Sequence, residues 1–303
     1  MHPADLAILL HRALEVRLAR LQELLGQTHW AEDMEQLHQV RVAARRLGAV
    51  LDLVDPEVYP GHKGQRRALK GLVDVLGLPR ELDVHADHLR AHHLEARSNT
   101  QAAVLEHLLE QVDRGRAKAR RIMAKELHRL RLPDLERLRS VPSLPDPFQA
   151  TSLQEAAWSC LEPRIAAALG DLAALSAQED PTALHKARVR IKKLRYAVEA
   201  LEGAFALPPE TVQKKLRELQ TLLGNHHDLA ALEALLWKAE ARLRTHDRAT
   251  LCGGVLELIG DVAEARRSVF YVFVTAAEGQ APAAFADDLR PALGLPLLKE
   301  SRP

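Results

Sequence analysis

One histidine- and arginine-rich pattern occurs twice in this chain of 303 residues. It reads LHQVRVAARRL from Leu37 and LHKARVRIKKL from Leu184. A constant shift of 147 residues superimposes the two copies and, without a gap, the flanking sequence from Leu6 to Leu82. The sequence therefore predicts an internal duplication, in which two similar halves are related by a pseudo-two-fold axis.

The spacing of apolar residues predicts an all-α fold. They recur every three or four positions almost everywhere, which is typical of amphipathic helices. Aromatic residues, which favour strands, make up only 4% of the chain, and we find no alternating run that indicates a strand. The expected helices cover residues 3–27, 33–55, 61–76, 79–131 with a break near Ser98, 150–176, 181–202, 209–223, 226–245 and 248–278.

A proline-rich connector separates the two predicted halves. Residues 133–149 contain four prolines, which a long unbroken helix does not tolerate. We therefore expect a single domain over 1–303, made of two antiparallel helical bundles, one from repeat half 3–132 and one from repeat half 150–300.

Composition excludes some classes of protein. The formal net charge is +1, so no overall basic field predicts a nucleic-acid binder. The N-terminal segment lacks the pattern of a signal peptide, and the longest apolar run, 269–277, is far shorter than the ~18–20 residues of a membrane span. We therefore expect a soluble, cytoplasmic protein without a membrane partner.

The repeated pattern places cations on one side of a helix. On a helical wheel, His38, Arg41 and Arg45 lie opposite the core-facing residues, with Arg46 at the margin. The second copy arranges its residues in the same way: His185, Arg188 and Lys192, with Lys193 at the margin. Like charges on one helix face repel each other, and an ordinary exposed face mixes signs. Repelling charges in both halves indicate a bound polyanion, although each face by itself could be ordinary solvated surface.

Further cations follow on the next helix of each half. Arg67 and Lys70 have their counterparts in Lys214 and Arg217. Weaker candidates for the same cationic lining are Arg17, Lys63, Arg66, Arg80, Arg120, Arg121, Arg164, Arg195, His227, Arg266 and Arg267.

A Leu-Gly pair follows these cations in both halves, at Gly77 and at Gly224. Glycine is the usual residue just beyond a helix C-terminus, where it adopts positive φ. We therefore expect a helix to end at each pair, with Glu81 and Asp228 in the first turn of the helix that follows.

These motifs resemble those of the CHAD family, the conserved-histidine α-helical domains. The stretch HKARVRIKKLRYAVEALE from His185 is very similar to the second-half motif of the family, and HQVRVAARRL from His38 to the first-half motif. The sequence departs from the pattern at Gly48, which stands where Arg195 stands in the second half, and at Glu81, which replaces the more usual Asp. The resemblance covers about residues 3–300.

The resemblance implies two helical bundles that enclose a basic groove or pore, binding of inorganic polyphosphate, and, for some members, association with polyphosphate granules. The motif positions that would line this cavity are His38, Arg41, Arg45, Arg46, His185, Arg188, Lys192 and Lys193.

The leading hypothesis from the sequence is non-catalytic binding of polyphosphate or another polyanion, with sulfate or phosphate as mimics. Arginine suits phosphate oxygens through its fork of donors. We expect no cofactor, no metal and no catalytic residue, since there is no P-loop and no acid cluster for Mg²⁺ on the basic faces. The alternatives are a phosphotransfer or polyphosphate-hydrolysing enzyme that uses the paired histidines, and a nucleic-acid binder, which would need aromatics among the cations.

Overall fold

The computed structural model describes residues 4–54, 62–96, 98–129, 152–170, 172–175, 179–245 and 249–297. The helices are α1 (Ala4–Gly26), α2 (Met34–Leu51), α3 (His62–Val75), α4 (Gly77–Leu94), α5 (Asn99–Arg129), α6 (Leu153–Leu169), α7 (Leu172–Leu175), α8 (Pro181–Ala200), the short 3₁₀ helix η2 (Glu202–Ala204), α9 (Glu210–Thr245), α10 (Ala249–Ala277) and α11 (Pro282–Ala292).

The all-α prediction is confirmed. Over the described ranges the secondary structure is helical, with turns and no strand. The break near Ser98 is present between α4 and α5. The predicted connector, 133–149, lies outside the described residues.

Equivalent aspartates begin the two motif helices. Asp33 caps α2 by accepting a hydrogen bond from the Gln36 N–H at 2.7 Å, and Asp180 caps α8 by accepting from the Thr182 N–H at 2.8 Å. A capping carboxylate satisfies a backbone donor that the helix itself leaves unpaired. The two caps are 147 residues apart, so both basic stretches begin their helices in the same register.

The expected helix end at the Leu-Gly pair is confirmed in the first half, where α3 ends at Val75, and is wrong in the second half. Residues 209–223 and 226–245 were expected as separate helices, but α9 runs unbroken through Gly224. In the first half α4 begins directly at Gly77, and the glycines with positive φ in the described parts of the chain are Gly279 and Gly294. Pro79 explains why the helix is interrupted in the first half only, because it removes a helical hydrogen bond at the position where the second half has His226.

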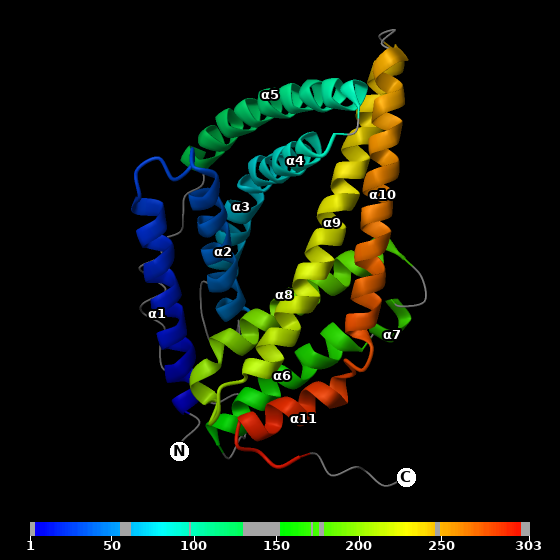
Figure 1. Cartoon of the computed structure of the whole chain (residues 1–303). Helices are drawn as coiled ribbons and strands as arrows, with labels where there is room; N and C mark the ends of the chain where they lie inside the picture. The colour runs from blue at the N-terminus through cyan, green and yellow to red at the C-terminus, as the bar shows by residue number, and fades with distance from the viewer. Residues whose placement is uncertain are drawn as a thin grey trace.

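The helices form two buried hydrophobic clusters. The larger one joins α1, α2 and α3 to α6, α8, α11, the start of α9 and the end of α10. The smaller one joins α4 and α5 to the rest of α9 and α10. Figure 1 shows these elements as a broad lower part, with the long α9–α10 pair rising to meet α5 at the top. Each cluster therefore contains residues from both predicted repeat halves.

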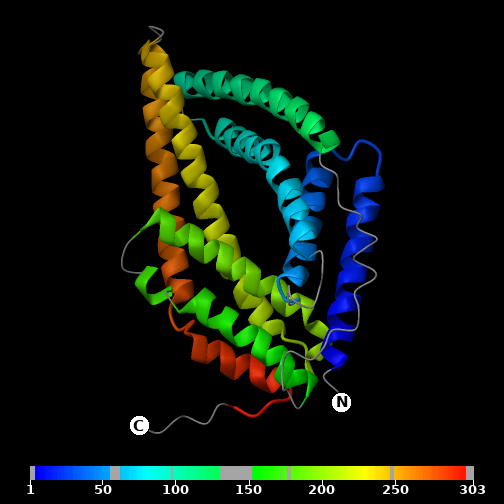
Figure 2. The ribbon, with the colours of Figure 1, turned by 180° about the vertical axis from the view of Figure 1, so that it is seen from behind.

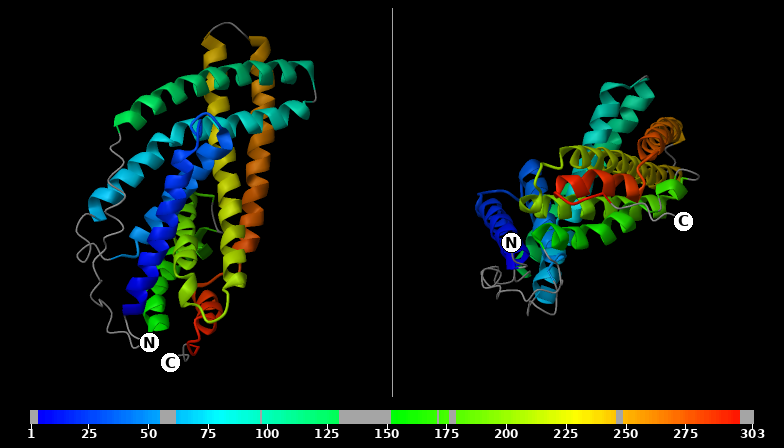
Figure 3. Two further views of the ribbon diagram at one scale, coloured as in Figure 1. Left: turned by 90° about the vertical axis from the view of Figure 1, so that its left-hand side faces the viewer. Right: turned by 90° about the horizontal axis from the view of Figure 1, so that it is seen from below.

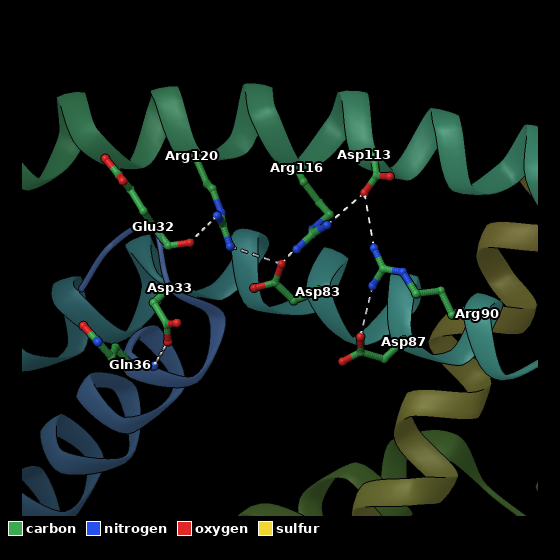
Figure 4. A network of polar contacts seen from close by, with 9 residues as sticks. All are labelled: Glu32, Asp33, Gln36, Asp83, Asp87, Arg90, Asp113, Arg116 and Arg120. Carbon is green, nitrogen blue, oxygen red and sulfur yellow. Dashed lines mark hydrogen bonds and ion pairs between the residues drawn. The ribbon is translucent and has the colours of Figure 1, made fainter. Parts of the chain in front are cut away.

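The arch of α5 over α4 is held by ion pairs (Figure 4). The side chain of Asp83 on α4 is fully buried, and its Oδ1 lies 2.7 Å from Arg116 Nε and 3.5 Å from Arg120 Nη2, both on α5. Arg120 also donates to the main-chain carbonyl of Glu32, which precedes α2. Seen from behind in Figure 2, α4 and α5 extend together from the α2–α3 side of the molecule to the α9–α10 pair.

Among the described residues, no helix has the combination of length and hydropathy that crossing a membrane requires.

Candidate anion-binding site

A polar cavity of about 350 Å³ lies between α2, α4, α8 and α9. Figure 3 shows these helices from the side and from below. The cavity is lined by charged and polar side chains from both halves. They are His38, Arg41 and Arg45 from α2, Arg80, Glu81 and His85 from α4, Arg188 from α8, and His227 and Asp228 from α9. The structure therefore brings together predicted residues that are far apart in sequence.

The backbone of α3 fixes Arg41 at this cavity. The guanidinium of Arg41 donates a hydrogen bond to the main-chain carbonyl of Val73 near the end of α3. A Cβ placed on Gly77 would lie 3.5 Å from Arg41 Nη1, so the glycine that opens α4 leaves the guanidinium close to the backbone. Gly77 thus contributes to the site through close approach, and it does so without the positive φ that was expected of it.

Burial and mutual repulsion lower the pKa values of two cations at the cavity, Arg41 and Arg45, and of Lys192, which lies beside the cavity without lining it. Burial, followed by the neighbouring Arg45 and Arg188, lowers the pKa of Lys192 to about 7. Burial and Arg45 together lower the pKa of Arg41 to about 10, against a raising effect from Asp74. Burial also lowers the pKa of Arg45, and Arg188 adds to that shift while Tyr196 opposes it. The charges on α2 and α8 are therefore close enough to repel across the boundary between the halves.

The histidines of the cavity favour their neutral form in the unliganded protein. Burial lowers the pKa of His38, with Arg80 as the next cause, and burial lowers the pKa of His227, with Arg188 as the next cause. His185 is exposed and lies against His227, with their ring centroids 5.4 Å apart. The Nδ1 atom of His38 is buried and has no hydrogen-bond partner among the described residues. This nitrogen thus has hydrogen-bonding capacity that the described residues do not use.

Four predicted cations lie away from this cavity, in two pairs at two places where the halves meet. Arg17 of α1 donates to the carbonyl of Glu199 at 3.0 Å, and Arg164 of α6 donates to the carbonyl of Asp52 at 2.7 Å. In the same way Arg46 lies 3.2 Å from the Glu199 carboxylate, and Lys193 lies 4.0 Å from that of Asp52. Both acceptors follow or end a motif helix, where cations are favoured by the helix dipole.

These contacts are equivalent under the 147-residue shift, since Asp52 corresponds to Glu199, Arg17 to Arg164 and Arg46 to Lys193. Each cation therefore reaches the end of the motif helix that belongs to the other half. The two marginal cations, Arg46 and Lys193, are engaged in protein contacts and are not among the residues that line the cavity.

Other predicted cations are held by carboxylates. Arg66 pairs with Asp52 at 2.6 Å, and the buried Arg195 pairs with Glu199 while donating to Gln220 at 2.8 Å. Arg266 of α10 pairs with Glu179 and Glu233, much as Arg120 of α5 bonds the carbonyl of Glu32. These contacts position helices and leave the cavity to other cations.

The remaining predicted cations are exposed on helix surfaces. They are Lys63, Arg67 and Lys70 on α3, Lys214 and Arg217 on α9, Arg121 on α5 and Arg267 on α10. Of the weaker candidates, Arg80 and His227 do line the cavity.

Sequence reasoning missed His85 as a cavity residue. Its side chain is 4% exposed, and both ring nitrogens lack a hydrogen-bond partner among the described residues. It lies on α4 at the position after Val84, where neither a repeat nor a basic face draws attention to it. In the described parts of the chain, no three or more His, Cys, Asp or Glu side chains are placed together to hold a metal ion.

Comparisons with known proteins agree with this architecture. The family model for the CHAD domain matches residues 12–237. The crystal structure of the CHAD domain from the plant Ricinus communis is similar with a TM-score of 0.63 and 24% identity, over 88% of this chain and 91% of that chain. PptA from Streptomyces chartreusis is similar with a TM-score of 0.67 and 17% identity, over 90% of this chain and 99% of that chain. At these identities the two likenesses show the fold alone. No curated protein sequence matches the chain.

Proposed function

The chain belongs to the CHAD domain family, and on that basis we propose that it binds inorganic polyphosphate in the cavity between α2, α4, α8 and α9, without catalysing a reaction. In this proposal the molecule is an internal duplication, and the two motif helices supply equivalent halves of one basic binding groove. In a cell, such binding would hold the protein at polyphosphate granules.

The observation that carries the proposal is the crowding of cations from both halves. Arg41, Arg45, Arg188 and Lys192 lie near one another, and their mutual repulsion adds to the larger effect of burial in lowering the pKa values of Arg41 and Lys192 in the unliganded protein. A polyanion would offset this repulsion and accept hydrogen bonds from the guanidinium groups. The carboxylates near the cavity, Asp74, Glu81 and Asp228, are fewer than the cations that surround it.

Contacts within the protein account for other basic residues. Arg116 and Arg120 neutralise Asp83, so the buried acid of α4 is paired with α5 and leaves Arg41 and Arg188 to the cavity. Apart from Arg41, which also donates to the Val73 carbonyl of α3, the cavity cations are thus distinct from the cations described above that hold the helices together. This distinction favours a binding role for Arg188 over a purely structural one.

Charge reversal tests the proposal. We expect Arg188→Glu to weaken binding of medium-length polyphosphate by at least about tenfold, because one charge-assisted hydrogen bond contributes about 1.5–3 kcal/mol and the new carboxylate repels the ligand. The melting temperature should stay equal or rise, because repulsion with Arg45 and Lys192 is relieved. The measurements are calorimetric titration and a thermal melt.

Arg267→Glu, at an exposed position on α10, is the matched control and should change the affinity little. Equal losses in both variants would show a diffuse electrostatic effect and contradict a defined site. An unchanged affinity in Arg188→Glu would contradict the proposal. Release of phosphate from polyphosphate with magnesium present would overturn its non-catalytic part.

A further inference from the structure

A second cavity of about 340 Å³ adjoins the basic one. It lies between α4, α5 and α9 and shares Glu81, His85 and Ala231 with the first cavity. Its other walls are largely apolar, with Leu82 from α4, Leu108 and Val112 from α5, and Leu235 from α9. One ligand could therefore occupy both cavities and would meet two different chemical environments.

His85 stands at the wall that the two cavities share. Its side chain is 4% exposed, and among the described residues neither ring nitrogen has a hydrogen-bond partner. Leaving a buried polar group unpaired costs about 1–3 kcal/mol. Such groups are uncommon in folded proteins, and a missing ligand is one explanation for them. The position of His85 indicates a ligand with polar atoms at the boundary between the cavities.

The chemistry of the boundary distinguishes between kinds of ligand. Burial lowers the pKa of His85; Glu81 and Asp228 oppose this shift, and His88 and Lys238 add to it. The ring therefore favours its neutral form, which has one hydrogen-bond donor and one acceptor. The carboxylate of Glu81 repels phosphate but accepts hydrogen bonds from hydroxyl groups. Further along, the amide nitrogen of Gln111 lies 2.7 Å from His107 Nε2, and the cations Lys238 and Arg242 are exposed.

An uncharged group with ring nitrogens and hydroxyls satisfies this boundary better than a continuing phosphate chain does. Its flat faces would pack on the leucine and valine side chains, as is usual in ligand pockets of this size. Its hydroxyls would bond to Glu81, and its ring atoms to His85.

We propose that the second cavity binds the nucleoside end of a nucleoside polyphosphate whose phosphates lie in the first cavity. For the binding of the phosphates, the inference rests on the proposed function. It adds a site for the end group, which would distinguish a phosphate chain that carries a nucleoside from one that does not. His85 is assigned as the residue that recognises the end group.

The test compares ATP with inorganic tripolyphosphate by calorimetric titration of the full chain. Tripolyphosphate has no organic group, so tighter binding of ATP measures the contribution of the second cavity. We expect ATP to bind at least about tenfold more tightly. Ala234→Leu fills the second cavity from an exposed position on α9, and it should remove this preference while leaving tripolyphosphate binding unchanged.

Two further variants keep the result interpretable. His85→Leu should also remove the preference and should fold at least as well as the wild type, because it replaces an unpaired buried polar side chain by an apolar one. Ala103→Leu, at an exposed alanine of α5 that does not line the cavity, is the matched control and should keep the preference.

Equal or weaker binding of ATP, with tripolyphosphate still bound, would overturn the end-group site and leave the proposed function standing. A preference that survives both Ala234→Leu and His85→Leu would also overturn it. Affinity that rises with the length of inorganic polyphosphate and loses this rise in Ala234→Leu would show that the phosphate chain itself enters the second cavity. If neither ligand binds, both proposals are wrong.

Discussion

Lys192 is not itself a lining residue, but it lies beside the arginines that line the cavity, and it differs from them because its charge state is within reach of physiological pH. Arginine stays protonated in all ordinary conditions. Lys192 is half-buried beside Arg45, Arg188 and Arg41, and its pKa of about 7 leaves it largely neutral at pH 8 in the unliganded protein. A bound polyanion favours the charged form, so ligand binding and proton uptake are linked at this residue.

We predict that polyphosphate binding at pH 8 takes up protons, with Lys192 as the main contributor. The affinity should fall as the pH rises above about 7, because the proton that binding requires becomes harder to acquire. Calorimetric titration in buffers of different ionisation enthalpy measures the uptake directly. Lys192→Met should reduce it, and an uptake that is unchanged in this variant would contradict the assignment.

The same group affects folding with a defined sign. The unfolded chain holds the Lys192 proton up to its ordinary pKa near 10.5, whereas the folded chain releases it near pH 7. Between these values the unfolded state binds more protons, so the contribution of Lys192 to the free energy of unfolding increases with pH. The increase should be smaller in Lys192→Met.

At the scale of elements, α4 is the helix that connects the cavity to the rest of the molecule. It carries Arg80, Glu81 and His85 at the cavities, and it presents Asp83 to α5. Because the side chain of Asp83 is fully buried between α4 and α5, its ion pairs with Arg116 and Arg120 orient one helix on the other (Figure 4).

We predict that Asp83→Ala lowers the free energy of unfolding by about 2 kcal/mol, since it removes hydrogen bonds to charged groups and leaves Arg116 and Arg120 without their carboxylate. Denaturant titration checks this value. Asp87→Ala is the matched control: Asp87 is an exposed carboxylate on the same helix, 3.2 Å from Arg90, and its loss should cost less than about 1 kcal/mol. Equal effects would show that the buried pair does not stabilise the α4–α5 contact.

At the scale of the whole molecule, the two hydrophobic clusters both combine the repeat halves. Neither half retains its complete core when separated, because the larger cluster includes both α2 and α8 and the smaller one includes both α5 and α10. The cations of α2 and α8 are brought together by the same packing that buries Val40 and Ile191 in the larger cluster. The site therefore depends on both halves being folded.

We predict that polyphosphate affinity falls by roughly a hundredfold between 50 and 200 mM salt. This estimate takes about five phosphate contacts and the slope of about −0.7 per contact that single-stranded nucleic acids show. The five cations considered are Arg41, Arg45, Arg80, Arg188 and Lys192. A series of titrations at different salt concentrations provides the slope, and a flat response would exclude an electrostatic site.

The sequence by itself determined the all-α class and the family, because apolar periodicity and the histidine motifs are local patterns. It also predicted that His38, Arg41, Arg45 and Arg188 share a functional face. It did not predict the continuous α9, because the same Leu-Gly pair occurs in both halves. Only the first half has a proline, Pro79, that interrupts the helix, and the second half has His226 at that position. Only tertiary packing separated the cations that line the cavity from Arg17, Arg46, Arg164 and Lys193, which bind Asp52 and Glu199. A helical wheel gives the direction of a side chain but not its partner, and for that reason the role of His85 became visible only once α4, α5 and α9 had been brought together.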